Sequence, residues 1–235
     1  HNTLCAFDFD GTLAPIVPDP PDAAMRARTR ELMCQMAQLY PCAIFSGRSR
    51  ADLREKLRGI AVRELVGNHG AEQNRRSTMA AHPPVATWIA ALDASLEGMA
   101  GVWTEDKGLS IAVHYRQQPN KTEARRRILQ AVRFMDGVRI VRGKQVINIM
   151  PDHAPHKGEA LLASRDRLAC DWILYVGDDV NDEDAFGVSG NIIPVRVGKR
   201  RHSKARYFVK SQAEIDDLLE ALVNFRKSPC GATAS

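Results

Sequence analysis

At residues 4–13 the chain reads Leu4-Cys5-Ala6-Phe7-Asp8-Phe9-Asp10-Gly11-Thr12-Leu13, and this stretch contains the first predicted strand. Its first four residues form a short apolar run, which is typical of a strand buried on both faces of a parallel sheet. Two carboxylates, Asp8 and Asp10, follow as the run ends. Similar apolar runs alternate with longer amphipathic segments, a pattern that indicates βαβ units and an α/β fold.

The elements of this parallel sheet lie in two separate parts of the chain. We expect strands at Leu4–Phe9, Cys42–Phe45, Val62–Val66, Trp172–Val176 and Ile192–Val197, with helices at Asp22–Tyr40, Arg50–Leu57, Lys157–Leu168 and Ala213–Phe225. The predicted parts of this domain are residues 1–80 and 154–235. Residues 228–235 are small and polar, and we expect them to form a flexible tail.

The middle of the chain has a different pattern, which predicts a second domain over residues 81–153. It reads as a helix followed by two strands, twice over, with tight turns inside each strand pair: Pro84–Met99, Trp103–Thr104, Leu109–Tyr115, Thr122–Met135, Val138–Arg142 and Gln145–Met150. Antiparallel hairpins within an otherwise parallel pattern indicate an insertion of α/β type, αββαββ, in the first domain.

Composition limits the classes of partner. The 235 residues are 44% hydrophobic and 26% charged, with a net charge of +5, so an anionic partner is favoured. The basic run Lys199–Lys204 has no interleaved aromatic residue for base stacking, and we expect a solvated loop and no nucleic-acid partner. No apolar run approaches the ~18 residues of a membrane span, and no signal peptide is evident. The five scattered cysteines predict reduced thiols and a cytoplasmic protein. The oligomeric state stays open.

Polar residues follow three of the predicted strands directly. Asp8 and Asp10 end the first, Ser46-Gly47-Arg48 follows the second, and Gly177-Asp178-Asp179 follows the strand near residue 175. In an open parallel sheet, ligands bind in the crevice beyond the carboxyl ends of the strands. We therefore expect these distant residues to converge at one site.

Converging carboxylates repel each other, so Asp8, Asp178 and Asp182 require a compensating cation. A set of oxygen ligands without paired His or Cys suits Mg²⁺. The competing interpretation is that each Asp caps a helix or turn. That interpretation would be preferred for one Asp-x-Asp-Gly alone, but several such groups at strand ends favour catalysis. His153 and His156 are spaced like a helical metal pair, but Pro155 lies between them and argues against a second metal site.

Four segments resemble, in order, the motifs of the haloacid dehalogenase superfamily of phosphatases: Asp8–Leu13, Ser46–Arg48, Lys157 and Gly177–Asp182. The resemblance implies a Rossmann-like core in which Asp8 attacks phosphorus and Asp10 is the general acid and base. It implies that the Asp8 side chain, the Asp10 carbonyl and Asp178 bind Mg²⁺, and that Ser46 and Lys157 hold phosphoryl oxygens. The residues implied to lie beside the metal or substrate are Asp179, Asn181, Asp182, Gly11, Thr12, Gly47 and Arg48.

Further segments resemble the trehalose-6-phosphate phosphatase family: 67–72, 105–108, 112–116 and 157–161. The insert would then be that family's cap domain, with Glu105, Lys107 and Arg116 on sugar hydroxyls and His69 and Gly70 at the substrate. Buried polar groups of this kind select a polyol. Without the resemblance, surface cross-strand pairs would be the preferred explanation of these charges.

Two positions depart from the family pattern and keep alternatives open. Asn148 stands where the family commonly has Glu, and Asn181 stands where it usually has Thr. We expect alternation in the last cap strand to point Asn148 at the sugar. The predicted substrate is trehalose 6-phosphate. A phosphatase for sucrose phosphate or a glycosyl-phosphoglycerate, a phosphomutase, and a catalytically silent binding domain are the alternatives.

Overall fold

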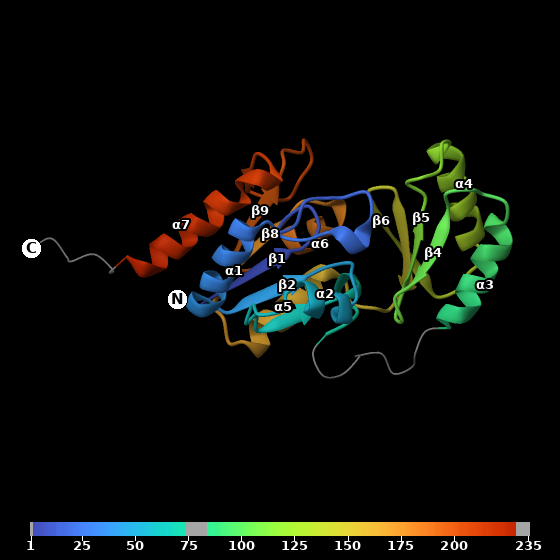
Figure 1. The fold of residues 1–235 in the computed structure, drawn as a ribbon. Coiled ribbons are helices and arrows are strands. Elements are labelled where there is room, and N and C mark those ends of the chain that lie inside the picture. Colours follow the sequence, from blue (N-terminus) through green and yellow to red (C-terminus); the bar gives the residue numbers. More distant parts are fainter. Residues whose placement is uncertain (1, 74–83, 229–235) are drawn as a thin grey trace, which may run out of the picture.

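The computed structural model describes residues 2–73 and 84–228. The chain forms two bodies, each built on its own sheet (Figure 1). The core elements are β1 (Thr3–Asp8), η1 (Pro20–Asp22), α1 (Ala27–Leu39), β2 (Cys42–Phe45), α2 (Arg50–Lys56), β3 (Glu64–Val66), η2 (Asn68–Gly70), α5 (Lys157–Arg167), β8 (Trp172–Gly177), η3 (Val180–Asp182), α6 (Glu183–Phe186), β9 (Ile192–Val197), β10 (Tyr207–Val209), η4 (Gln212–Glu214) and α7 (Ile215–Lys227).

The core sheet has the order β10-β9-β8-β1-β2-β3, and all of its neighbouring strands are parallel. The chain builds outward from β1 to β3 and then resumes on the other side of β1 with β8. This change of direction places a crevice beyond the carboxyl ends of β1 and β8, where open α/β sheets bind ligands. The predicted α/β core is confirmed.

Alternating residues of β1 face two apolar layers. Cys5 and Phe7 pack with residues of α1 and α7 such as Met33 and Leu219. Leu4 and Ala6 pack on the opposite face with residues of α5 and α6. Because both faces are covered, β1 is buried from Leu4 to Asp8, as its continuous apolar run predicts. Its carboxyl end at Asp8 is therefore fixed by packing on both sides.

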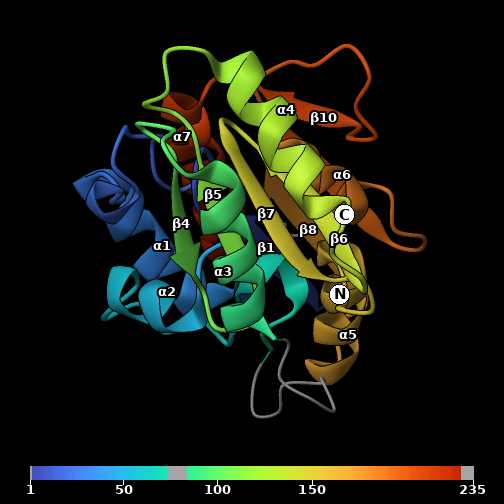
Figure 2. The same cartoon turned by 90° about the vertical axis from the view of Figure 1, so that its right-hand side faces the viewer.

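The second body is the cap, an antiparallel sheet in the order β4-β5-β7-β6. Its elements are α3 (Val85–Leu96), β4 (Trp103–Asp106), β5 (Ile111–His114), α4 (Lys121–Val132), β6 (Val138–Gly143) and β7 (Val146–Pro151). Helices α3 and α4 cover the face of this sheet that is turned away from the core (Figure 2). Residues such as Trp88, Ile111, Val113 and Ile147 pack between helices and sheet. The predicted αββαββ insertion is confirmed.

The other face of the cap sheet is turned toward the core. The pairing register aligns Glu105 of β4 with Ala112 of β5, and Ala112 with Asn148 of β7. Since paired residues of neighbouring strands share a face, Glu105 and Asn148 lie in one row across the small Ala112 side chain. The alternation predicted for the last cap strand is observed.

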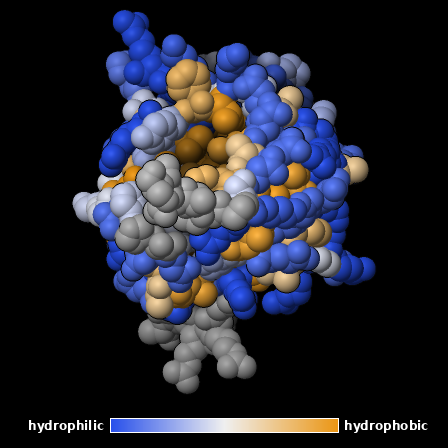
Figure 3. Space-filling view, turned by 90° about the vertical axis from the view of Figure 1, so that its left-hand side faces the viewer, coloured by the Kyte–Doolittle hydropathy of each residue, from blue (hydrophilic) through white to orange (hydrophobic). Residues whose placement is uncertain are grey.

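The side of the core that is turned away from the cap does not line the cavity that is described below. Figure 3 shows hydrophilic side chains around a smaller group of hydrophobic ones on this face. Helix α7 lies on this side of the molecule in Figure 1 and carries Phe225, which is 79% exposed. Among the described residues, no helix combines the length and apolar character needed to cross a membrane.

Some expectations differ from the structure in detail. The first helix begins at Ala27 and not at Asp22, because residues 20–22 form a 3₁₀ turn. Lys56 donates to the Pro21 carbonyl within this turn and to the Ala23 carbonyl directly after it. The short elements α6 and β10 were not predicted. The predicted domain boundary at residues 80 and 81 and most of the predicted tail, from residue 229, lie outside the described residues. The division at residues 153 and 154 stays a prediction.

Candidate active site

A cavity of about 220 Å³ lies between the carboxyl edge of the core sheet and the inner face of the cap. Its walls include fourteen of the residues predicted from the sequence: Asp8, Asp10, Ser46, Gly47, Arg48, His69, Glu105, Lys107, Arg116, Asn148, Lys157, Asp178, Asp179 and Asn181. Asp8, Ser46 and Asp178 therefore meet at one place, as expected from the ends of their strands, and residues of the cap join them there.

Lys157 and two carboxylates form the buried centre of this site. The Lys157 ammonium donates to Asp8 Oδ1 at 2.6 Å and to Asp182 Oδ1 at 2.7 Å. Burial alone would lower the pKa of Lys157, but the charges of Asp182 and Asp8 raise it well above its usual value. The amine is therefore charged where it faces the cavity, so it can attract an anionic group.

The position of Lys157 follows from the start of helix α5. His156 precedes it as the N-cap, and its Nδ1 accepts from the backbone N–H groups of Gly158 and Glu159. The Glu159 side chain accepts from the His156 N–H in return, which completes a capping box. His156 thus has a structural role as the N-cap of α5. This role was not expected when its spacing from His153 was considered as that of a metal pair. His156 fixes the first turn from which Lys157 reaches the cavity.

Three carboxylates can share a cation here. Ligand oxygens of Asp8, Asp178 and Asp182 lie within 4.8 Å of one another, and this is the metal-compatible group found among the described residues. Burial and the neighbouring Asp182 raise the pKa of Asp178 to about 6. Burial, opposed by Lys157, raises the pKa of Asp8 as well. Both pKa shifts are in the direction expected for buried carboxylates that have too little positive charge beside them.

The geometry around Asp178 fits a hard divalent cation. Asp178 Oδ1 is buried and has no hydrogen-bond partner among the described residues. Gly11 has a φ of +90°, and a Cβ there would lie 2.3 Å from Asp178 Oδ2, so only glycine leaves room for this carboxylate. Asp182 has less free capacity to bind a metal ion, because its two oxygens already accept hydrogen bonds from Lys157, Tyr175 and the Asp179 N–H. Asp8 and Asp178 are the better candidate ligands.

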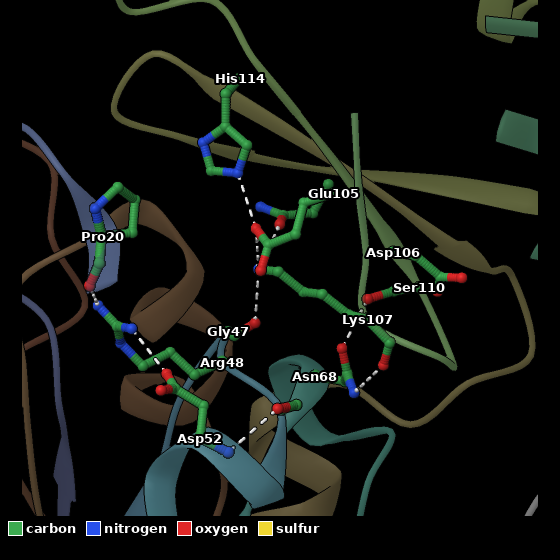
Figure 4. A network of polar contacts seen from close by, with 12 residues as sticks. Pro20, Gly47, Arg48, Asp52, Asn68, Glu105, Asp106, Lys107, Ser110 and His114 are labelled. Atoms are coloured by element: carbon green, nitrogen blue, oxygen red, sulfur yellow. Dashed lines mark hydrogen bonds and ion pairs between the residues drawn. The ribbon is translucent and has the colours of Figure 1, made fainter. Parts of the chain in front are cut away.

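Asp10 is held apart from this cluster by Arg48. The guanidinium donates to both oxygens of Asp10 at 2.7 Å and to Asp52 at 2.7 Å. It also donates to the Pro20 carbonyl at 2.7 Å (Figure 4). Such a bidentate pair fixes the carboxylate direction strongly. Ser46, which is almost fully buried, accepts from the Arg48 N–H through Oγ at 3.2 Å, so the 46–48 loop is ordered as one unit.

The cap residues meet the core through Lys107. Its ammonium donates to the Gly47 carbonyl at 2.9 Å and reaches Asn148 Oδ1 at 3.5 Å. Burial lowers the pKa of this lysine, and the nearby Glu105 carboxylate opposes the shift. Glu105 itself bonds to His114 Nε2 at 2.8 Å (Figure 4). Lys107 therefore connects the cap to the loop that carries Ser46.

Two further residues, Asn68 and Arg116, hold the cap over the core. Asn68 accepts from Ser110 at 2.7 Å and donates to the Lys107 carbonyl at 3.3 Å (Figure 4). Arg116, predicted at the sugar, donates to the Val17 carbonyl at 2.5 Å.

Asn148 is only 3% exposed, so it does not face solvent. Its amide donates to the Val141 carbonyl at 3.3 Å, which leaves its oxygen directed at Lys107.

His69 is a buried polar group with unused hydrogen-bonding capacity. Both ring nitrogens lack a hydrogen-bond partner among the described residues, and the ring packs on Gly47. Burial, together with the charges of Lys157 and Lys107, lowers the pKa of His69 well below its usual value. The neutral ring offers one donor and one acceptor at the wall of the cavity.

Other predicted residues do not line the cavity. Thr12 is fully buried behind the first loop, and its hydroxyl has no partner among the described residues. Gly70 has a φ of +113°, and a Cβ there would lie 2.8 Å from the His156 carbonyl, so this glycine allows close packing against the start of α5. Gly11 supports the site because it leaves space for the Asp178 carboxylate. The roles proposed for these residues at the substrate stay predictions.

Comparison with known proteins agrees with this geometry. A family model described as Trehalose-phosphatase matches residues 6–213. The chain belongs to the trehalose-phosphatase family. It is 32% identical over 237 residues to the trehalose-phosphate phosphatase of Mycobacterium ulcerans, covering 93% of this chain and 60% of that protein. The chain thus spans less than two thirds of the length of this curated relative. The resemblance found in the motifs is confirmed.

Solved structures agree at the level of the fold. The C-terminal domain of the Candida albicans trehalose-6-phosphate phosphatase superposes with a TM-score of 0.82 at 22% identity, covering 95% of this chain and 93% of that one. A phosphatase of the haloalkanoate superfamily from Bacteroides thetaiotaomicron has a TM-score of 0.65 at 13% identity, covering 95% of each chain. Both solved structures therefore share the fold of this chain, a Rossmann-like core with an inserted cap.

Sequence reasoning missed charged residues at the site and beside it. Asp52, which lines the cavity and binds Arg48, is one of them, and Lys144 and Arg196 are two others. Lys144, in the turn between β6 and β7, donates from the cap to Asp178 Oδ2 at 3.0 Å. Arg196, in β9, donates to the backbone carbonyl of Asp178. The signal for Arg196 was a charge near the carboxyl end of the apolar run Ile192–Val197, the same position that identified the aspartates. Lys144 gave no comparable signal, because lysines are common in exposed turns.

Proposed function

We propose that this chain hydrolyses trehalose 6-phosphate to trehalose and phosphate in a Mg²⁺-dependent reaction through Asp8. The observation that carries the proposal is the buried group of Asp8, Asp178 and Lys157 at the floor of a cavity whose roof is the polar face of the cap. Membership of the trehalose-phosphatase family supports the sugar. A Mg²⁺ ion bound by Asp8 and Asp178 would supply the positive charge that lets a carboxylate approach a phosphate.

In the first step, an oxygen of Asp8 bonds to phosphorus while the bond from phosphorus to the sugar oxygen breaks. The sugar oxygen takes a proton from the Asp10 carboxyl group, which leaves trehalose and an aspartyl-phosphate. In the second step, a water oxygen bonds to phosphorus, Asp10 takes back a proton, and the bond to Asp8 breaks. Phosphate and the free Asp8 carboxylate result, and atoms and protons balance.

The chain's own residues have separate parts in this reaction. Lys157 holds the Asp8 oxygen at 2.6 Å and places a charge beside the transferring phosphoryl group. Ser46 lies at the same wall and binds a phosphoryl oxygen. Asp10 is paired with Arg48 through both oxygens, so it has to leave this guanidinium, at least in part, to protonate the sugar oxygen.

The cap is proposed to recognise the sugar. Glu105, Lys107, Asn148 and Arg116 line the roof of the cavity and offer donors and acceptors to hydroxyl groups. A site built from such groups rejects partners that leave them unpaired. Asn148 would contribute a neutral hydrogen bond where the family commonly has Glu. The cytoplasmic location expected from the cysteines stays a prediction.

The test is phosphate release from a panel of sugar phosphates with Mg²⁺ present. We expect the highest kcat/KM for trehalose 6-phosphate and loss of turnover on chelation. Higher kcat/KM for sucrose phosphate or a glycosyl-phosphoglycerate would transfer the proposal to that substrate. Transfer of the phosphoryl group to a second sugar would identify a phosphomutase, and no turnover of any sugar phosphate would indicate a silent domain.

A further inference from the structure

Arg196 is a buried cation that the proposed reaction does not use. It lies near the carboxyl end of β9, in register with Gly177 of β8, and is 7% exposed. Burying a guanidinium is unfavourable unless its donors are bound. A buried arginine beside the loop that carries Asp178 therefore calls for a specific role.

The contacts of Arg196 are with the backbone of that loop. One terminal nitrogen, Nη2, donates to the Asp178 carbonyl, and the other, Nη1, donates to the Asp179 carbonyl at 3.1 Å. Nη1 also binds Glu183 Oε1 at 2.9 Å. One planar group thus joins two consecutive peptide units to the first residue of α6. Because the guanidinium is rigid, these contacts fix the path of the chain between β8 and α6.

The Asp178 carboxylate has little other support. Its Oδ1 has no partner among the described residues, and its Oδ2 accepts only from Lys144, whose side chain is 57% exposed. Gly11 leaves space for the carboxylate but provides no hydrogen-bonding side chain. The direction in which Asp178 faces the cavity is therefore set mainly by its backbone, which Arg196 holds.

Arg196 does not itself line the cavity that contains Asp8. It borders a neighbouring hollow of about 420 Å³ with Lys144 and Lys199, and its donors are turned to the loop carbonyls and Glu183. Direct binding of the substrate phosphate by Arg196 is thus not supported by this geometry.

We propose that Arg196 is a positioning residue, which orders the Asp178–Asp179 backbone so that the Asp178 carboxylate meets the divalent cation. This inference rests on the proposed Mg²⁺ site. A role in fold stability alone would change the melting temperature without changing metal affinity below it, and this difference makes the proposal testable.

The experiment is calorimetric titration of the metal-free protein with Mg²⁺, at a temperature where circular dichroism shows every variant to be folded. We expect Arg196→Met to raise the Kd for Mg²⁺ at least tenfold and Arg196→Lys to lie between this variant and the wild type. Arg167→Met is the matched control. Arg167 also pairs with a buried carboxylate, Glu64, at 2.8 Å, but it does not line the cavity. The control should lower the melting temperature and leave the Kd within about twofold, as distant sites usually act independently.

The proposal is overturned if folded Arg196→Met binds Mg²⁺ with the wild-type Kd, or if Arg167→Met weakens binding as much. Should Arg196→Met fail to fold, Arg196→Gln replaces it, with the same expected direction and the same overturning result. Absence of Mg²⁺ binding by the wild-type protein would overturn the proposed metal site, and the role of Arg196 with it. If the wild-type protein binds Mg²⁺ and Arg196→Met binds it with the same Kd, only the proposed role of Arg196 is overturned.

Discussion

The Lys157 ammonium lies 2.6 Å from Asp8 Oδ1, although the two residues are 149 positions apart in the chain. Both side chains are at most 7% exposed, and the same ammonium also binds Asp182. The pair brings the two separate parts of the core together at the wall of the cavity. It also leaves one positive charge among buried carboxylates, so the stability of the core depends on it.

Lys157→Met should strongly destabilise the metal-free protein. Removing one partner of a buried ion pair typically costs about 3–5 kcal/mol, because the remaining charge is left uncompensated. Urea unfolding in the presence of chelator measures the free energy of unfolding. Lys121→Met, on the exposed start of α4, is the control and should change it by less than about 0.5 kcal/mol. Equal unfolding free energies for the two variants would contradict the buried-pair description.

Asp178→Asn should have the opposite effect on the metal-free protein at pH 7.5. The pKa of Asp178 is raised from 3.8 to about 6, so the folded state binds its proton more tightly than the unfolded state does. The carboxyl group therefore lowers stability as pH rises from about 4 to about 6, by roughly 3 kcal/mol at most. Asparagine does not ionise, so the variant does not lose this stability as the pH rises.

Chemical unfolding across pH 4 to 8 with chelator checks this prediction. The asparagine variant should be the more stable protein at pH 7.5, and the difference should shrink toward pH 4. With saturating Mg²⁺ the order should reverse, since ligand bound only to the folded state stabilises it. Lower stability of the variant at pH 7.5 in chelator would contradict the assigned direction of the shift.

Asp10→Asn should reduce turnover of the sugar phosphate more than turnover of p-nitrophenyl phosphate. A positioned acid or base contributes about 10²–10⁴-fold, and the nitrophenolate leaving group needs little protonation. Steady-state kcat for the two substrates gives the ratio. An equal loss on both would show that Asp10 acts through Arg48 or the metal and not as the proton donor.

Lys107→Met should lower kcat/KM for trehalose 6-phosphate by about 10–100-fold, in line with the loss of a charged hydrogen bond. Lys107 joins the cap to Gly47 and faces the cavity, so both cap closure and sugar contact are weakened. Small aryl phosphates, which need no cap contact, should be affected less. Lys121→Met, on the exposed start of α4, is the matched cap control and should leave both rates unchanged. Unchanged kcat/KM in Lys107→Met would remove the cap from substrate selection.

Much of the core could be predicted from the sequence because local patterns determine it. The apolar run before Asp8 is long enough for one buried strand, and the strand at Cys42–Phe45 was placed with its observed bounds. The convergence of Asp8, Ser46 and Asp178 follows from the parallel order of their strands. The row of Glu105 and Asn148 follows from alternation within antiparallel strands.

The rest depended on contacts that local patterns do not contain. Nothing near Lys144 in the sequence indicates that a cap turn reaches Asp178, because the distance between cap and core is a tertiary property. His156 was considered as a metal ligand, and its role as the N-cap of α5 depends on the direction of its side chain. Arg48 was expected at the substrate, but its bidentate pair with Asp10 depends on how two loops approach each other.

The central claim is that Asp8 is the nucleophile of a trehalose 6-phosphate phosphatase. The most direct measurement is phosphate release from trehalose 6-phosphate, in Mg²⁺, by the wild-type protein and by Asp8→Asn, with circular dichroism to show that both are folded. Asparagine keeps the shape and removes the attacking carboxylate, so we predict robust wild-type turnover and a loss on the order of 10³-fold or more in the variant. Turnover by folded Asp8→Asn at a rate near that of the wild type would contradict the account.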